Sequence, residues 1–433
     1  MLTYTLTTLT NGLTLIRIPM ASVQSVTFLA LCNTGSRYEQ PKVEGIAHFF
    51  EHMVFKGTAK YPDAQTLSAT IDSIGADFNA FTSKEYTGYY VQAASMHLPL
   101  AVDVVSDMLL QPQLRPADIE REKSVIIEEM NMYKDTPARH IGELYEEMVY
   151  AQQGLRHNII GTKETIQAMG QKDFHSFLRQ WYGLSNMIVV VAGEAPVVND
   201  PATLELIERA FSKEAGERNP DKIALDAFLS KKSISDEKLH LEFKKTEQAH
   251  FILGWPGLKR TDENRYILAL LTTIMGGNMS SRLFTEIREK RGLSYYVHAD
   301  MDQYHETGMF GASSGVDPKR VEEAIQVAID EFQSVADGRK PITKEELKKA
   351  KDFTAGKLVL SLEDSQSVAQ YFGMKQLLTG EIKTPTQVLE EYNKVTLDQV
   401  HDLAQRLVKA DQVRLALIGP YKSRSKFEKI ISG

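Results

Sequence analysis

Apolar positions along the chain alternate in some segments and recur every three or four residues in others. Asn11-Gly12 lies between two alternating segments, and this pair favours a tight turn with positive φ, so a hairpin is predicted there. The alternating or continuous apolar runs predict strands at 26–31, 77–82, 87–94 and 187–193. The three-to-four-residue spacing predicts helices at 45–54, 62–74, 97–110, 116–134, 138–151 and 172–181.

The helix and strand that close this first half have a counterpart about 226 residues later. Leu397–His401 repeats the helix, and 413–419 repeats the apolar strand that ends in glycine. At the front of the second half, 251–255 matches the strand at 26–31, and both precede a helix. The alternative is a coincidence of common helix–strand patterns.

We therefore predict an α+β fold with two similar domains, 1–215 and 222–433. Each domain is expected to be an antiparallel-rich sheet with helices packed on one face. The polar stretch Ser212 to Asp221 is the predicted linker. Gly276-Gly277 predicts either a flexible loop or the end of a helix.

Composition narrows the class of protein. The chain has 433 residues, 42% hydrophobic and 25% charged, which is typical of a soluble globular protein. A net charge of −7 argues against a nucleic-acid partner. Cys32 is the only cysteine, so neither an intrachain disulfide nor a thiolate metal cluster is possible.

No segment has the pattern of a targeting signal or of a membrane span. The first residues are neither a secretory signal nor an Arg-rich transit peptide, and no run approaches the ~18 apolar residues of a span. We expect a cytoplasmic protein, although a mature chain whose signal has been removed would have the same sequence.

The strongest candidate chemistry lies in His48-Phe49-Phe50-Glu51-His52. Histidines four apart share one face of a helix, so both imidazoles can bind one cation. Glu51 lies beside them, where a carboxylate can hold a water on the metal. His-x-x-Glu-His is the inverzincin signature of zinc peptidases.

A catalytic zinc usually has three protein ligands, and the helix at 116–134 offers several carboxylates for the third position. Glu128 lies on a polar face, whereas Glu129 shares its face with Glu122, Val125, Ile126 and Tyr133. A carboxylate on an apolar face needs a cation, so Glu129 is the favoured ligand and Glu122 could orient the ligands. Alternatively, Glu129 pairs with Lys123 or Arg121. The isolated histidines are expected to be caps or surface residues; these are His97, His140, His157, His175 and His401.

Residues 45–58 resemble the signature of the pitrilysin family of zinc metallopeptidases, which includes insulin-degrading enzyme and the mitochondrial processing peptidase. The family pattern places the third ligand 77 positions after the second histidine, which is Glu129 in this chain. An acidic residue seven positions earlier matches Glu122. The resemblance implies one zinc per chain on His48, His52 and Glu129, with Glu51 as general base.

The resemblance extends to other segments of the chain. Gly35-Ser36-Arg37 with Glu39 precedes the motif as in the family. Asn79, Ala80 and Phe81 look like the strand that binds substrate by its edge. Arg288 and Tyr295 resemble the pair directed at substrate, and Tyr295 could also donate to the oxyanion; the adjacent Tyr296 leaves that assignment open by one residue.

The expected function is a zinc-dependent endopeptidase that cleaves extended, unfolded or presequence-like peptides. The size resembles the processing-peptidase branch, in which two chains pair into a clam-like chamber. A homodimer is favoured because one chain carries both the zinc motif and Arg288 with Tyr295; a heterodimer with a related subunit stays open. The alternative function is a non-catalytic structural or substrate-binding subunit of a heterodimeric peptidase or larger complex.

Overall fold

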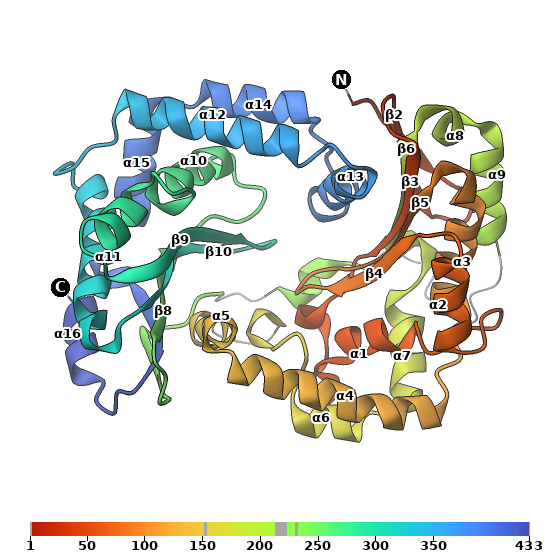
Figure 1. Ribbon diagram of the computed structural model, residues 1–433, viewed down its shortest axis with the longest axis horizontal. Helices are drawn as coiled ribbons and strands as arrows, with labels where there is room; N and C mark the ends of the chain where they lie inside the picture. The colour runs from red at the N-terminus through yellow and green to blue at the C-terminus, as the bar shows by residue number, and fades with distance from the viewer. Residues whose placement is uncertain (1, 151–153, 213–222, 230–232, 433) are drawn as a thin grey trace. The chain divides into compact units, whose positions relative to one another are not determined.

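The computed structural model describes residues 2–150, 154–212, 223–229 and 233–432 (Figure 1). Nearly all of the predicted linker, from residue 213 onward, lies outside these residues. The chain forms two compact units, each described by itself. Unit 1 comprises Met1–Met130, His157–Phe228 and Val359–Thr386; unit 2 comprises Asn131–Arg156, Leu229–Leu358 and Gln387–Gly433.

Unit 1 is built on a six-stranded sheet with the order β1-β2-β6-β3-β5-β4. Only β2 and β6 pair in parallel, and the other pairs are antiparallel. The predicted hairpin joins β1 to β2, and Gly12 at its turn has a φ of +87°. The strands are β1 (Thr5–Thr8), β2 (Thr14–Met20), β3 (Ser25–Cys32), β4 (Asp77–Thr82), β5 (Thr87–Ala94) and β6 (Met187–Glu194).

Unit 2 is built on a five-stranded sheet with the order β7-β11-β8-β10-β9. Here β7 and β11 are parallel, and the other neighbouring strands are antiparallel. The five strands β2-β6-β3-β5-β4 of unit 1 have the same sequence of one parallel pair followed by antiparallel pairs. The strands are β7 (Leu239–Phe243), β8 (Ala249–Pro256), β9 (Ser294–Gln303), β10 (Gly308–Val316) and β11 (Arg414–Gly419). The same order and directions in both sheets confirm the predicted fold class of two similar, antiparallel-rich α+β halves.

The six helices predicted in the first half of the chain are all observed, each with ends within about two residues of the expected positions. Those of unit 1 are α1 (Ile46–Met53), α2 (Ala64–Asp72), α3 (Leu98–Leu110), α6 (Lys163–Ala168), α7 (Gln171–Trp181), α8 (Ala195–Asn199), α9 (Pro201–Ala210) and α13 (Ser365–Thr379). Those of unit 2 are α5 (Pro137–Val149), α10 (Arg265–Gly276), α11 (Val321–Ala336), α15 (Leu397–Leu407) and α16 (Ser425–Ser432). Three of the unit boundaries fall within helices: α4 (Pro116–Asp135), α12 (Lys344–Leu360) and α14 (Pro385–Lys394).

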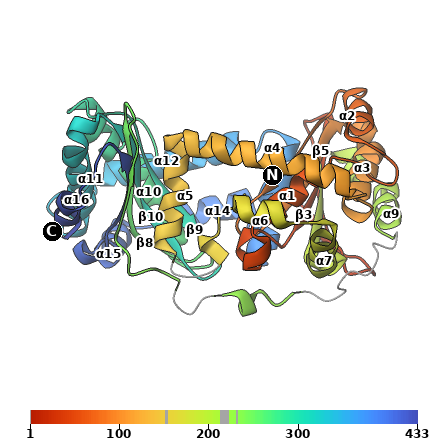
Figure 2. The same ribbon diagram turned by 90° about the horizontal axis from the view of Figure 1, so that it is seen from below.

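One helix from the C-terminal part of the sequence covers a face of the unit 1 sheet. Helix α13 lies beside β3 and β6 (Figure 1), and its Val368 and Phe372 are fully buried against Leu29, Leu31 and Val190. Strand alternation sends Phe28 to the opposite face, where its ring lies 6.2 Å from that of Phe211. On that side α3 and α9 lie side by side (Figure 2).

The unit 2 sheet is covered in the same way by α5, which comes from the N-terminal half of the sequence. Ile141, Leu144 and Met148 of α5 pack with Ala416 and Ile418 of β11. Each sheet therefore has one helix from the other half of the chain on its second face, whereas the sequence led us to expect helices on one face only. The predicted domains 1–215 and 222–433 describe which segments repeat, and that division stays a prediction.

The Gly276-Gly277 pair forms the end of a helix. Gly276 is the last residue of α10 and Gly277 its C-cap, and a Cβ on Gly276 would collide with the backbone of Ala299. Of the two expectations for this pair, the helix end is the one observed. No helix among the described residues combines the length and the apolar character needed to cross a membrane.

Candidate metal centre

The motif helix α1 begins at a glycine that no other residue could replace without strain. Gly45 has a φ of +93°, and a Cβ there would collide with the carbonyl oxygen of Ile160. The two oxygens of the buried Glu39 carboxyl group accept hydrogen bonds from the backbone N–H groups of Gly45 (2.7 Å) and Ala47 (2.8 Å). These bonds satisfy the first donors of α1, which a helix cannot satisfy itself.

Aromatic packing fixes the rotation of α1 about its axis. The ring of Phe49 lies 4.9 Å from that of Phe174, and the ring of Phe50 lies 4.9 Å from that of Tyr182. All four rings are buried. With these two residues held in the core, His48 and His52 lie together on another side of the helix, with ring centroids 4.7 Å apart.

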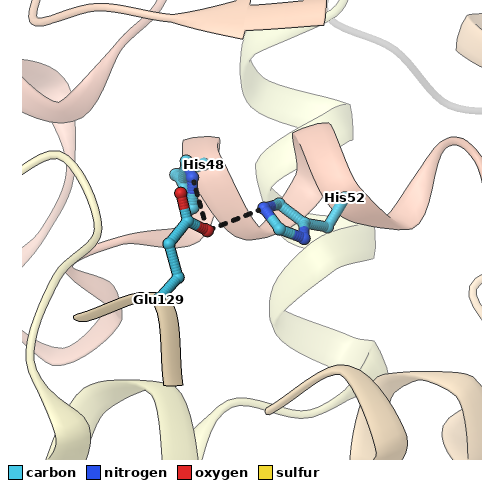
Figure 3. Close-up of side chains that lie close together, drawn as sticks. All are labelled: His48, His52 and Glu129. Atoms are coloured by element: carbon cyan, nitrogen blue, oxygen red, sulfur yellow. Dashed lines mark ion pairs between the residues drawn. The ribbon is translucent and has the colours of Figure 1, made fainter. Parts of the chain in front are cut away.

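His48, His52 and Glu129 converge on one point of unit 1 (Figure 3). Oε2 of Glu129 lies 3.7 Å from Nε2 of His48 and 3.4 Å from Nε2 of His52. One ligand atom from each residue lies within 4.8 Å of the other two. The structure thus brings together the three residues for which the sequence predicted a metal site.

This donor set fits a zinc ion. Tetrahedral ligands at the usual zinc–nitrogen and zinc–oxygen distances are about 3.4 Å apart, close to the two separations from Glu129. Two imidazoles and one carboxylate are also a ligand set of catalytic zinc sites, which leave one position for water or substrate. His48, His52 and Glu129 are therefore the residues that would hold the metal.

The two imidazoles have opposite electrostatic surroundings. Burial lowers the pKa of His48 to about 4, assisted by the neighbouring His52, so the ring is neutral as a metal ligand must be. Burial also opposes charge on His52, but hydrogen bonds to Glu122 and Glu129 outweigh it and raise the pKa of His52 to about 9. A metal would have to displace a proton from His52.

Glu122 orients His52 from behind. Its Oε1 lies 3.0 Å from Nδ1 of His52, and its Oε2 forms an ion pair with Nζ of Lys56 at 2.7 Å. Burial alone would raise the pKa of Glu122, but these two partners hold that pKa below its ordinary value. An acceptor at Nδ1 leaves Nε2 of His52 for the metal. Glu122 thus lies where the sequence predicted a ligand-orienting carboxylate.

Glu51 lies in the same half-buried region. Burial raises the pKa of its carboxyl above the ordinary value, and the nearby Thr82 hydroxyl opposes part of that shift. A carboxylate with a raised pKa is a better proton acceptor, which suits a general base.

Lys123 and Arg121, the alternative partners considered for Glu129, form ion pairs with other residues of α4. Lys123 pairs with Glu120 at 2.7 Å, and Arg121 pairs with Asp118 at 3.2 Å, in place of either pairing with Glu129. Glu128 is exposed. Val125 was expected on a buried face, but it is 48% exposed, so the face of α4 that carries Glu129 is partly open.

The strand expected to bind substrate is the last strand of the unit 1 sheet. β4 pairs only with β5 in that sheet, so its other edge is not used by a described strand. Asn79 is exposed and its Oδ1 accepts a bond from the N–H of Ala80, while the Phe81 ring packs over Gly88. The edge position is observed; the role of these residues in substrate binding stays a prediction.

Arg288 and Tyr295 lie together in unit 2, whereas the metal-binding group lies in unit 1. The Arg288 guanidinium is 5.1 Å from the centroid of the Tyr295 ring and 4.8 Å from that of Phe284. Tyr295 is 76% exposed. The Tyr296 hydroxyl is 2.8 Å from Nδ1 of His250 and the residue is half-buried, so Tyr295 is the more exposed of the two; the choice of Tyr295 as the substrate-facing residue stays a prediction.

Among the isolated histidines, His140 differs most from expectation. It was expected to be a cap or surface residue. It is buried, because α5, the helix that carries it, packs against the unit 2 sheet. Its two nitrogens lie 2.9 Å from Glu143 and 3.3 Å from Glu242. His157 is also largely covered and pairs with Glu44 at 3.2 Å. His175 is exposed, as expected.

Two residues near the centre were not singled out from the sequence. Lys56 lies in the turn that follows α1, and its ion pair with Glu122 places it behind His52. Thr82 lies two residues after Ala80 on β4, so strand alternation places both side chains on the same face of the sheet.

Comparisons with known proteins agree with this geometry. Residues 20–163 match the family model for insulinase (peptidase family M16), and 169–353 match that for the peptidase M16 inactive domain. An uncharacterised zinc protease of Streptomyces coelicolor is 35% identical, covering 96% of this chain and 90% of the relative. The uncharacterised zinc protease YmxG of Bacillus subtilis is 34% identical, covering 95% and 97%.

Solved structures share the fold. A protease from Helicobacter pylori superimposes with a TM-score of 0.87 at 22% identity, covering 97% of this chain and 100% of that chain. A structure from Pseudomonas fluorescens, titled a peptidase M16 inactive domain, gives 0.86 at 17% identity, covering 97% and 98%. Together with relatives that are 35% and 34% identical over nearly the whole chain, these matches confirm the resemblance seen at 45–58: the chain belongs to the insulinase-type peptidase family M16.

Proposed function

We propose that the protein is a zinc-dependent endopeptidase with one zinc per chain. The observation that carries the proposal is the convergence of His48, His52 and Glu129 with Glu51 beside them in one half-buried region. Curated relatives named as zinc proteases support the same chemistry.

Each side chain has a distinct task in the proposed hydrolysis. Bound zinc would supply Lewis acidity to the attacking water and to the scissile carbonyl. The Glu51 carboxylate takes a proton from the attacking water and passes it to the leaving amine. Glu122 keeps His52 in the ligand tautomer, and Lys56 keeps Glu122 ionised.

The substrate is proposed to bind as an added strand. An extended peptide would pair with the open edge of β4, and its backbone would supply most of the affinity. Asn79 lies on this strand with its side chain exposed, and Ala80 and Phe81 follow it. Such binding places few demands on side chains, which suits unfolded or presequence-like peptides as substrates.

Arg288 and the exposed Tyr295 are proposed to bind substrate, and Tyr295 to donate to the developing oxyanion. Because one chain carries these residues and the metal-binding group, a homodimer that encloses a chamber is the preferred assembly, and a heterodimer with a related subunit is its competitor.

A non-catalytic subunit is the second candidate function. It is supported by the match of 169–353 to the inactive-domain model. That segment, however, contains none of His48, Glu51, His52 or Glu129, all of which lie within the region matched by the insulinase model. The candidate predicts peptide binding without cleavage.

Metal content and peptide cleavage measured on the same preparation test the proposal. The purified chain should contain one zinc by elemental analysis and cleave an internally quenched fluorogenic peptide. A chelator should abolish cleavage, and added zinc should restore it. A fully zinc-loaded chain that binds peptides from a diverse library but cleaves none would contradict the proposal and favour the non-catalytic candidate.

A further inference from the structure

The five residues Gly35 to Glu39, between β3 and α1, contact two separate parts of the proposed active site. One is the turn of the β4–β5 hairpin, at Ser83 to Glu85; the other is the first turn of α1. We call this segment the brace. All five of its residues are buried.

On the hairpin side the brace is held by backbone and side chain together. The N–H of Ser36 donates to the carbonyl of Ser83 at 3.2 Å, and that of Arg37 to Lys84 at 3.0 Å. The Arg37 guanidinium forms an ion pair with Glu85, and the two side chains are 2% and 1% exposed. A Cβ on Gly35 would collide with the backbone of Ser83 and Lys84, so the two segments are in direct contact.

On the helix side the brace ends in Glu39. The N–H groups of Gly45 and Ala47 donate hydrogen bonds to different oxygens of its carboxyl group. Glutamine could present only one acceptor in this place, because its NH₂ group would face an N–H donor. The start of α1 is therefore tied to a side chain only two positions from Arg37.

The two elements that the brace connects have to be aligned for the proposed reaction. α1 carries Glu51 and two metal ligands. β4 ends at Thr82, directly before the clamped turn, and carries the edge on which the substrate is proposed to lie. The hydroxyl of Thr82 lies close enough to Glu51 to affect its carboxyl.

We propose that Arg37 and Glu39 are positioning residues that fix the substrate strand β4 against the motif helix α1. This inference rests on the proposed peptidase function. An apolar pair in place of Arg37 and Glu85 could be equally stable, because a buried ion pair loses hydration on folding. The Arg37–Glu85 ion pair and the two acceptor oxygens of Glu39 bond only in one geometry. They therefore specify one position of the hairpin relative to the helix.

Misalignment of a reacting group by about 1 Å can lower a rate by about 100-fold, so the expected signature is a loss of kcat. Two variants test the brace: Glu39→Gln on the helix side and the charge-free pair Arg37→Met/Glu85→Gln on the hairpin side. The double variant avoids leaving one charge buried alone. Arg37→Lys keeps the charge and should recover part of the loss. Glu331→Gln is the matched control, because Glu331 is also a buried carboxylate paired with a lysine, Lys340, but lies in unit 2.

In the zinc-loaded variants, kcat should fall by at least about tenfold with KM changed by less than about threefold and zinc content unchanged. In Glu39→Gln, amide hydrogen exchange should become faster at Gly45 and Ala47. In the double variant, it should become faster at Ser36 and at position 37. The control should match the unaltered chain in both readouts. Unchanged kcat in a folded variant would overturn the inference, whether or not exchange quickens.

The exchange measurement separates failure of the inference from failure of the proposed function. If the unaltered zinc-loaded chain cleaves no peptide, the peptidase proposal fails. The link between hairpin and helix is then judged by exchange alone: faster exchange at the brace and at β4 together in the double variant supports it, and unchanged exchange overturns it.

Discussion

At the scale of single residues, the proposed chemistry depends on a difference between two adjacent glutamates. Glu129 faces His48 and His52, whereas Glu128 is exposed on the same helix. This distinction could be predicted, because the period of a helix determines which side chains share a face. The role of Lys56 could not be predicted with equal force, since it lies beyond the end of α1, where helical spacing no longer determines which side chains are neighbours.

Replacing each of these two glutamates by glutamine should separate their roles. Glu129→Gln removes a charged ligand and should weaken zinc binding by more than about 100-fold, because even residues behind the ligands contribute about 10–100-fold. Glu128→Gln should leave the affinity within about twofold, because it changes only a solvated carboxylate. Competition with a fluorescent zinc chelator measures both. Equal affinities in the two variants would remove Glu129 from the ligand set.

The protonation state of His52 leads to a pH dependence of metal binding. In the metal-free protein the pKa of His52 is raised to about 9, so the ring carries a proton at neutral pH that zinc must displace. Zinc affinity should therefore fall as pH is lowered below about 9, and binding near pH 7.5 should release about one proton.

Titration calorimetry in two buffers with different ionisation enthalpies measures this release. The number of protons should approach zero above the pKa of His52, that is, above about pH 9. Binding at neutral pH without any proton release would show that zinc does not replace a proton on His52.

At the scale of secondary-structure elements, local periodicity predicted most helices and strands of the first half well, but not their packing partners. β4 and β5 were predicted with the bounds that the structure shows, and α1 within about two residues. An apolar stripe does not identify the sheet it packs on, so the placement of α5 and α13 on sheets from the other half of the sequence could not be predicted. The burial of His140 has the same cause, because His140 lies on α5 where this helix packs against the unit 2 sheet.

The packing of α13 on the unit 1 sheet should contribute strongly to stability. Phe372 is fully buried between this helix and β3, so Phe372→Ala should lower the free energy of unfolding by about 3–5 kcal/mol. Leu360→Ala is the matched control: Leu360 is 64% exposed and should cost less than about 0.5 kcal/mol. Urea unfolding followed by circular dichroism compares them. A similar small loss in both variants would mean that α13 is not part of the unit 1 core.

At the scale of the whole molecule, the repeated strand order explains why one chain carries two kinds of functional residue. The first copy of the sheet supports the metal-binding group, and the second supports Arg288 and Tyr295. The repeat itself could be predicted from the helix–strand pattern that recurs near the end of each half. The number of chains in the assembly is not encoded in such a pattern.

The preferred assembly gives a simple expectation for solution mass. A chain of 48.7 kDa that forms a homodimer should sediment with about twice that mass when purified alone. Sedimentation equilibrium over a range of concentrations measures it. A stable monomer that gains peptidase activity only when a related subunit is added would favour the heterodimer.

The most direct test of the central claim is the turnover of Glu51→Gln at full zinc occupancy. The carboxamide is isosteric but cannot accept the proton, so we predict one zinc per chain, as in the unaltered protein, and a kcat lower by at least about 100-fold. A zinc-loaded Glu51→Gln chain that cleaves the fluorogenic peptide at the unaltered rate would contradict the assignment of Glu51 as the base and the mechanism built on it.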